Sequence, residues 1–449
     1  MVKYALLLGA VALALLVAPN AWAASDADLD EIRTQIKELR SSYEARIRAL
    51  EDRLKEAEAK AAAPTPAPVA TSAPGSAAAA SSLSAFNPAI SVVLQGTYAN
   101  LSQDPSKFAI AGFAPGGEIG PGKRGFSIGE SEVAMSANVD DKFAGNLIMS
   151  LSPENTVSVE EAYGLWLTAP YGLAPKFGRF FSALGYLNEQ HQHTWDFVDA
   201  PLAYQAFLGG QYATDGIQAK WVAPIDHYLE LSAEVGNGNG FPGSARNRSG
   251  VGSATVFAHT GGDIGLSNSW RAGISYLRTR AQDRAYTLAD NAGNDADVSF
   301  TGTSRVAVAD FVWKYAPNGN ARETSFKLQG EYFWRRERGD FTFVDASSYS
   351  ARQSGWYVQG VYQFMPTWRI GARYDRLDPG SVDYGANTAT FGATDFSPKR
   401  YSVMLDYTPS EFSRLRLQFA QSRTLPEVTD NQWFVQYVLS LGAHGAHKY

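Results

Sequence analysis

Apolar and polar residues alternate along most of the chain after residue 88, which is the pattern of β-strands with two unlike faces. The segment 326–332 reads FKLQGEY, and segments 370–375, 401–407 and 433–441 repeat the alternation. In most of these segments the apolar face begins or ends in Tyr, Trp or Phe. Aromatic residues that bound an apolar face, opposite a polar face, are typical of strands in a transmembrane barrel.

About sixteen such segments occur between residues 88 and 449, and their connections alternate between short and long. Short connections, such as 139–142 and 365–367, interleave with long ones, such as 185–215, 281–302 and 339–350. This layout predicts an all-β transmembrane barrel of about 16 antiparallel strands, with both termini on the short-turn side. A soluble all-β protein of this length would divide into packed domains, and the sequence shows no linker after Pro88.

The first 87 residues show three other patterns. Residues 1–23 combine Lys3, an apolar run to Ala18 and the small-x-small site Ala21-Trp22-Ala23, which together predict an export signal peptide. In residues 24–60, apolar positions three and four apart form the narrow seam of a coiled coil, which needs other copies of itself to bury that seam. Residues 61–87 are mostly Ala, Pro, Ser and Thr and predict a flexible linker.

The connection at residues 185–215 is too long for a hairpin turn and has no secondary-structure period of its own. A structureless insert of this length in a compact fold is usually functional or disordered. Its aromatic residues argue against disorder, because they provide surface to bury. We therefore expect this third outer connection to fold into the barrel mouth as a constriction loop.

Four residues of this loop are candidate metal ligands, namely Glu189, His191, His193 and Asp196. Imidazole nitrogen and carboxylate oxygen are ligands that zinc accepts. On a helical turn Glu189, His193 and Asp196 share one face, whereas on a strand Glu189, His191 and His193 do. We expect at most weak binding, because a permeating ion must also leave. The alternative is a polar loop that forms hydrogen bonds within the barrel mouth.

The charges of the loop predict an ion preference. The loop holds four Asp or Glu residues, and no Lys or Arg occurs between Arg179 and Lys220. A narrow lumen strengthens fixed charges, so the loop should favour cations over phosphate unless arginines of the barrel wall cancel its potential. Arg179, Arg369 and Arg373 are the candidates for that role, and together with Asp199 they are the predicted residues of the constriction and lumen.

The sequence contains no convincing catalytic constellation. It has no cysteine, which excludes disulfides and thiol chemistry, and its net charge of −6 does not favour nucleic acid as a partner. Residues 125–129 read GFSIG, but a nucleophile elbow needs a strand before its serine and a helix after it. We expect no enzyme and no resident cofactor apart from weakly bound zinc. A barrel enzyme with Ser, His and Asp at one position is the alternative.

The order of export signal, coiled coil, Ala/Pro linker and barrel resembles the phosphate-selective porin O and P family of Gram-negative outer membranes. The strings KFGRF at 176–180, FVDAPL at 197–202 and DGIQ at 215–218 are similar to the third-loop region of that family. The resemblance implies a homotrimeric passive channel for small solutes or ions in outer-membrane lipid, with the coiled coil in the periplasm. A phosphate channel needs Lys and Arg at its constriction, so anion selectivity is kept only as an alternative.

Residues 188–193 and the final string GAHGAHKY are similar to zinc-linked relatives that are labelled TonB-dependent receptors. A true TonB-dependent transporter needs a folded plug domain and about twenty-two strands, and residues 24–88 provide no such plug. We therefore expect an open channel without energy coupling. A structural tether, in which the coiled coil contacts the cell wall and the barrel is only an anchor, is a further alternative.

Overall fold

The computed structural model describes residues 88–442, so the predicted signal peptide, coiled coil and linker lie outside the described residues, as do residues 443–449. The strands are β1 (Ala89–Leu101), β2 (Gly125–Ser127), β3 (Ser131–Asn138), β4 (Phe143–Leu151), β5 (Val157–Trp166), β6 (Leu173–Phe181), β7 (Ala213–Val222), β8 (Tyr228–Gly236), β9 (Ser253–Ile264), β10 (Asn268–Ala289), β11 (Asp295–Tyr315), β12 (Ser325–Thr342), β13 (Ala346–Met365), β14 (Trp368–Asp383), β15 (Lys399–Ser410), β16 (Ser413–Arg423) and β17 (Asp430–Gly442).

Helical segments between residues 88 and 442 are few and short. They are the α-helix α3 (Leu202–Leu208) and the 3-10 turns η1 (Pro105–Lys107), η2 (Pro170–Gly172), η3 (Gln192–Thr194), η4 (Pro317–Gly319) and η5 (Gly385–Ala389). Within residues 88–442, no helix has the length and apolar character needed to cross a membrane.

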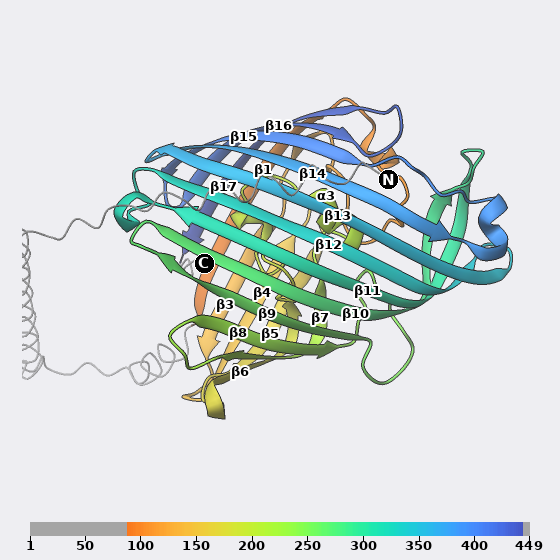
Figure 1. Cartoon of the computed structure of the whole chain (residues 1–449). Helices are drawn as coiled ribbons and strands as arrows, with labels where there is room; N and C mark the ends of the chain where they lie inside the picture. The colour runs from red at the N-terminus through yellow and green to blue at the C-terminus, as the bar shows by residue number, and fades with distance from the viewer. Residues whose placement is uncertain (1–87, 443–449) are drawn as a thin grey trace, which may run out of the picture. The chain divides into compact units, whose positions relative to one another are not determined.

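The strands form one antiparallel sheet that closes on itself, because β1 pairs with β17 on one side and with β2 and β3 on the other (Figure 1). β2 and β3 both pair with β1 and together act as one barrel strand, interrupted at residues 128–130. At the interruption, Gly129 has a φ of 59°, and the Ser131 hydroxyl accepts a hydrogen bond from the backbone N–H of Gln95 at 3.1 Å. The barrel therefore has sixteen strands, as the alternation predicted, and the short β2 is an extra segment of one of them.

Apolar residues of the sheet face mainly outward and polar residues mainly inward, which is the opposite of the arrangement in a soluble protein. On β17, for example, Trp433, Val435 and Tyr437 are exposed on the outside, whereas the inward positions hold the buried Gln432, Phe434 and Gln436. Apolar side chains on the outside and polar ones inside are expected where the barrel surface meets lipid and the lumen holds water.

Two predicted long loops are strand instead. The predicted loop 281–302 is largely taken up by the ends of β10 and β11, and the predicted loop 339–350 by β12 and β13. These four strands of 18 to 22 residues form the tall wall in Figure 1. Their ends are held by a buried aromatic cluster that includes Phe300, Phe341 and Tyr349. Polar residues of these ranges, such as Asp297 and Asp340, thus occupy exposed positions of extended strands.

Candidate functional site

The connection between β6 and β7, residues 182–212, is called the inner loop below. It is the third connection on the long-loop side, as predicted, although the predicted range 185–215 extended into the first residues of β7. Its helix α3 is buried over all seven residues and contacts β12, β13 and β14. Since these strands form part of the barrel wall, the inner loop fills part of the lumen (Figure 1).

An apolar cluster inside the barrel holds α3 against the wall. Phe207 of α3 stacks on Phe333 of β12, with ring centroids 5.7 Å apart and an interplanar angle of 5°. It also meets Phe113 edge-on at 5.5 Å, and the guanidinium of Arg335 lies 5.1 Å from its ring centroid. Gly209 ends the helix with a φ of 68°, a conformation that suits glycine.

Carboxylates of the barrel wall accept hydrogen bonds from backbone N–H groups of the inner loop. Glu234 accepts a hydrogen bond from the Ala183 amide at 3.0 Å. Glu331 accepts hydrogen bonds from the Leu187 amide at 3.0 Å and from the Tyr204 hydroxyl at 2.8 Å. Buried backbone donors need such partners, and loop amides here obtain them from strand side chains. Side chains of the barrel wall therefore help to fix the position of the inner loop.

Asp199 anchors the loop through a buried group of alternating charges. Its carboxylate contacts Arg373 at 2.8 Å and Arg400 at 2.5 Å and accepts a hydrogen bond from Gln418 at 2.9 Å. Asp375 completes the group, 3.0 Å from Arg373. Burial opposes ionisation of Asp199, but the two guanidinium groups outweigh it and hold the pKa of Asp199 at about 2. Asp199 and Arg373 thus lie inside the barrel.

The other loop carboxylates also have basic partners. Lys220 of β7 contacts Glu189 at 2.6 Å, and Lys327 and Arg369 both contact Asp196. Arg369 therefore lies inside the barrel. Glu189 and Asp196 are bound to these cations and are not grouped with the histidines, so the structure does not assemble the predicted four-residue metal site.

Arg179 lies elsewhere than predicted. It forms an ion pair at 2.6 Å with Asp215 of β7, and the two side chains are 45% and 43% exposed. Asp215 shares its strand face with the exposed Ile217, whereas the adjacent Gln218 is buried. The prediction that Arg179 lines the lumen is therefore wrong. The physical reason is that Arg179 lies on the outward face of β6, where it pairs with its cross-strand neighbour.

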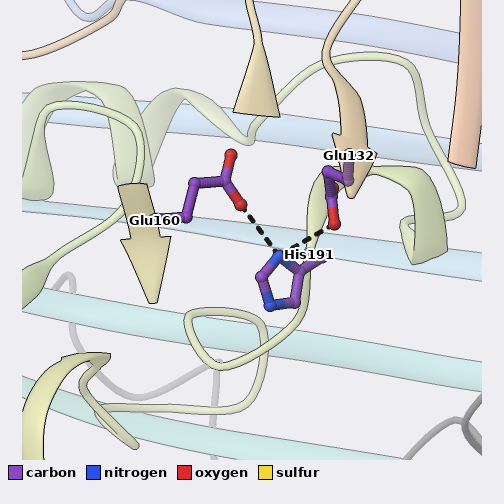
Figure 2. A group of neighbouring side chains, drawn as sticks. All are labelled: Glu132, Glu160 and His191. Carbon is purple, nitrogen blue, oxygen red and sulfur yellow. Dashed lines mark hydrogen bonds and ion pairs between the residues drawn. The ribbon is translucent and has the colours of Figure 1, made fainter. Parts of the chain in front are cut away.

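The partners of His191 and His193 come from the barrel wall. The Nδ1 atom of His191 lies 3.0 Å from Glu160 Oε2 and 3.3 Å from Glu132 Oε2, and its Nε2 atom lies 3.2 Å from Glu161 Oε2. Figure 2 shows Glu132 and Glu160 pointing toward the His191 ring. The Nδ1 atom of His193 lies 2.9 Å from Glu132 Oε1. These five residues are called the His–Glu cluster below.

A β-bulge brings two consecutive glutamates to the same side of β5. Ile148 of β4 pairs with Glu161, but the next residue, Met149, pairs with Val159, so Glu160 is the additional residue. A bulge shifts the alternation by one position and re-aims side chains. Glu160 and Glu161 therefore both reach His191, although regular alternation would place one of them on the outer face.

The charge of His191 follows from these contacts. Burial opposes protonation of its ring, but the hydrogen bonds with Glu160 and Glu161 and the nearby charge of Glu132 outweigh burial. Together they raise the pKa of His191 well above its usual value. His191 therefore serves as a cation between carboxylates as long as no other cation takes that place.

The His–Glu cluster borders a lumen cavity of about 820 Å³. The cavity begins beside short-turn residues such as Pro366 and Phe412 and reaches the inner loop at His191 and Asp196. Carboxylates of β3 and β5 line it, as do basic residues of β11, β12, β14 and β16, namely Lys314, Lys327, Arg369 and Arg414. A water-accessible cavity thus connects the short-turn end of the barrel with the inner loop.

A closed sixteen-strand barrel with an apolar outer surface, a polar interior and a loop folded into the lumen has the architecture of outer-membrane channels. Two solved structures share this fold. The outer membrane channel DcaP of Acinetobacter baumannii has a TM-score of 0.51 at 12% identity, and covers 79% of this chain and 97% of its own. In-vitro folded OmpT of Vibrio cholerae, an outer membrane protein in a trimer form, has a TM-score of 0.50 at 10% identity, and covers 79% and 99%.

The sequence identifies the family more narrowly. No protein-family model matches the chain. An uncharacterized protein of Aquifex aeolicus (strain VF5) is 31% identical over 398 residues, which cover 82% of this chain and 81% of that protein. The chain belongs to the same family as this Aquifex aeolicus protein.

Proposed function

We propose that the protein is a channel of the outer membrane, through which small hydrophilic solutes and ions diffuse passively. The observation that carries the proposal is the lumen cavity, which opens at the short-turn end and reaches the inner loop. Hydrogen bonds to strand side chains hold that loop against the barrel wall. A wall that satisfies the loop's backbone keeps the constriction in place without an energy-coupled plug. The outward apolar faces of the strands support a location in lipid.

Ion selectivity of this channel should be weak. The loop carboxylates that suggested a preference for cations are paired with Lys or Arg of the barrel, which the sequence of the loop alone does not reveal. Five carboxylates and four Lys or Arg residues line the cavity. Fixed charges of both signs in similar number leave little net potential to sort ions by sign. Divalent cations are the exception that the His–Glu cluster suggests.

A catalytic role does not form part of the proposal. Ser127, the serine of the GFSIG string, lies in β2, where it pairs with Thr97 of β1. Strand β3 follows it, whereas a nucleophile elbow requires a helix after the serine. The string is therefore better explained as part of the interrupted barrel strand.

The proposal is tested by osmotic swelling of liposomes that contain the purified, folded protein. Liposomes diluted into an isotonic solution of a small sugar such as arabinose should swell rapidly, because the sugar enters through the lumen. A bulky tetrasaccharide such as stachyose should cause much slower swelling, because the inner loop narrows the passage. Liposomes made with heat-unfolded protein serve as the control. Equal swelling with folded and unfolded protein would contradict a channel.

We also propose that the protein assembles as a homotrimer. The seam predicted for residues 24–60 favours self-association, and one of the two solved structures described above is a trimer form. Native mass spectrometry of the full chain, released from detergent micelles, should give three times the chain mass. A single-chain mass at every protein concentration would refute the trimer.

A further inference from the structure

We propose that Glu132, Glu160 and His191 form a binding site for a divalent transition-metal ion of the zinc class at the inner end of the lumen cavity. The inference deepens the proposed function, on which it rests in one respect: the ion reaches the site through the channel cavity. It replaces the predicted set of Glu189, His191, His193 and Asp196, of which only His191 remains a direct ligand.

The spacing of the ligand atoms fits a tetrahedral ion. One atom from each of Glu132, Glu160 and His191 lies within 4.8 Å of the other two. With metal–ligand bonds of about 2.1 Å, neighbouring ligands of a tetrahedral zinc ion are roughly 3.4 Å apart. The Nδ1 atom of His191 lies 3.0 Å and 3.3 Å from the two carboxylate oxygens. Small side-chain shifts therefore suffice to admit an ion (Figure 2).

The remaining members of the His–Glu cluster orient these ligands. Glu161 lies 3.2 Å from Nε2, the ring nitrogen of His191 that does not face Glu132 and Glu160. A carboxylate on the far nitrogen of a metal-bound histidine fixes the tautomer and the ring orientation. Glu161 is itself held by the amide of Phe181 at 3.1 Å. His193 lies 2.9 Å from Glu132 Oε1 and so orients the ligating carboxylate.

The bulge in β5 directs two consecutive glutamates toward His191. With regular alternation, only one of Glu160 and Glu161 would face the lumen. The bulge gives His191 a carboxylate on each ring nitrogen, one as a ligand and one as an orienting partner. Bulges often re-aim side chains at functional sites.

The ligand chemistry selects the class of ion. An imidazole nitrogen with two carboxylates suits zinc, copper or nickel, whereas calcium and magnesium prefer oxygen ligands alone. Three protein ligands leave a fourth tetrahedral position for water. Because His191 and Glu132 line the cavity, an ion held there can exchange with the lumen. Such a site retains the metal without trapping it.

The test is a zinc titration of the full chain, purified in detergent and followed by isothermal calorimetry. All variants carry H444A and H447A, so that the histidines of the C-terminal string do not contribute. We expect one zinc ion per chain and at least tenfold weaker binding in H191A and E160Q. The control H227A, which alters a histidine paired with Thr260, should bind as the parent does. Calcium should bind at least tenfold more weakly than zinc.

A zinc-edge X-ray absorption spectrum of the parent supplies a second reading that needs no variant at the site. It should show nitrogen and oxygen ligands only, with scattering from a single imidazole. No zinc binding by the parent, unchanged affinity in both H191A and E160Q, or a spectrum with two or more imidazoles would each overturn the proposal. Because binding is measured in detergent, its failure is distinguishable from failure of the channel function, which liposome swelling reads separately.

Discussion

Replacing Asp199 with Ala is expected to release the inner loop from the wall and to lower the free energy of unfolding by about 3–5 kcal/mol. The substitution leaves Arg373 and Arg400 buried next to Asp375 with one negative charge removed. Breaking a buried charge group is costly because the remaining charge has no solvent to compensate it. A released loop should narrow the lumen less, so the single-channel conductance should rise.

Urea unfolding in detergent micelles, followed by tryptophan fluorescence, measures the stability change for D199A. The matched control is E154A, which removes the carboxylate of an exposed ion pair with Lys123, whose side chains are 54% and 59% exposed. Exposed pairs contribute little because water screens them, so E154A should behave as the wild type in both stability and conductance. Equal effects of D199A and E154A would show that Asp199 does not anchor the loop.

Replacing Phe207 with Ala should cost about 3–5 kcal/mol of stability, as is typical for deletion of a buried aromatic side chain. The ring of Phe207 is fully buried and links α3 to Phe333 and Phe113. Its loss removes stacking contacts and leaves a cavity next to the guanidinium of Arg335. Because α3 fills part of the lumen, we also expect larger or more variable conductance steps.

The control for F207A is F126A, since Phe126 is 89% exposed and contacts the ring of Tyr98 on β1. Loss of that contact should cost no more than about 1 kcal/mol. The temperature at which the barrel unfolds during gel electrophoresis provides the comparison. If F207A unfolds at the same temperature as F126A, packing of α3 in the apolar cluster does not stabilise the barrel.

The fold was predictable because alternation is a local property of the sequence. On β17, the outward Trp433, Val435 and Tyr437 alternate with the inward Gln432, Phe434 and Gln436, and this register needs no knowledge of the rest of the chain. The inner loop was also predictable, since its length and aromatic residues required burial. The tall wall was not, because polar residues at the exposed positions of β10–β13 resemble loop sequence.

The proposed metal ligands were only partly predictable, because they come from three segments that are separate in sequence. His191 stood out as a ligand type, but its partners Glu132 and Glu160 lie on β3 and β5. The pairing of Asp196 with Lys327 likewise depends on a strand more than a hundred residues away. One signal was present in the sequence: Glu160 and Glu161 are adjacent polar residues within a strand, which alternation does not allow without a bulge.

The most direct test of the central claim, that the protein is a passive outer-membrane channel, is single-channel recording in planar lipid bilayers. Purified protein, shown to be folded by its heat-dependent migration in gels, is added to a bilayer in symmetric potassium chloride with no energy source. We predict stepwise, steady increases in current that scale linearly with small applied voltages. A bilayer that stays silent after insertion of folded protein would contradict the account.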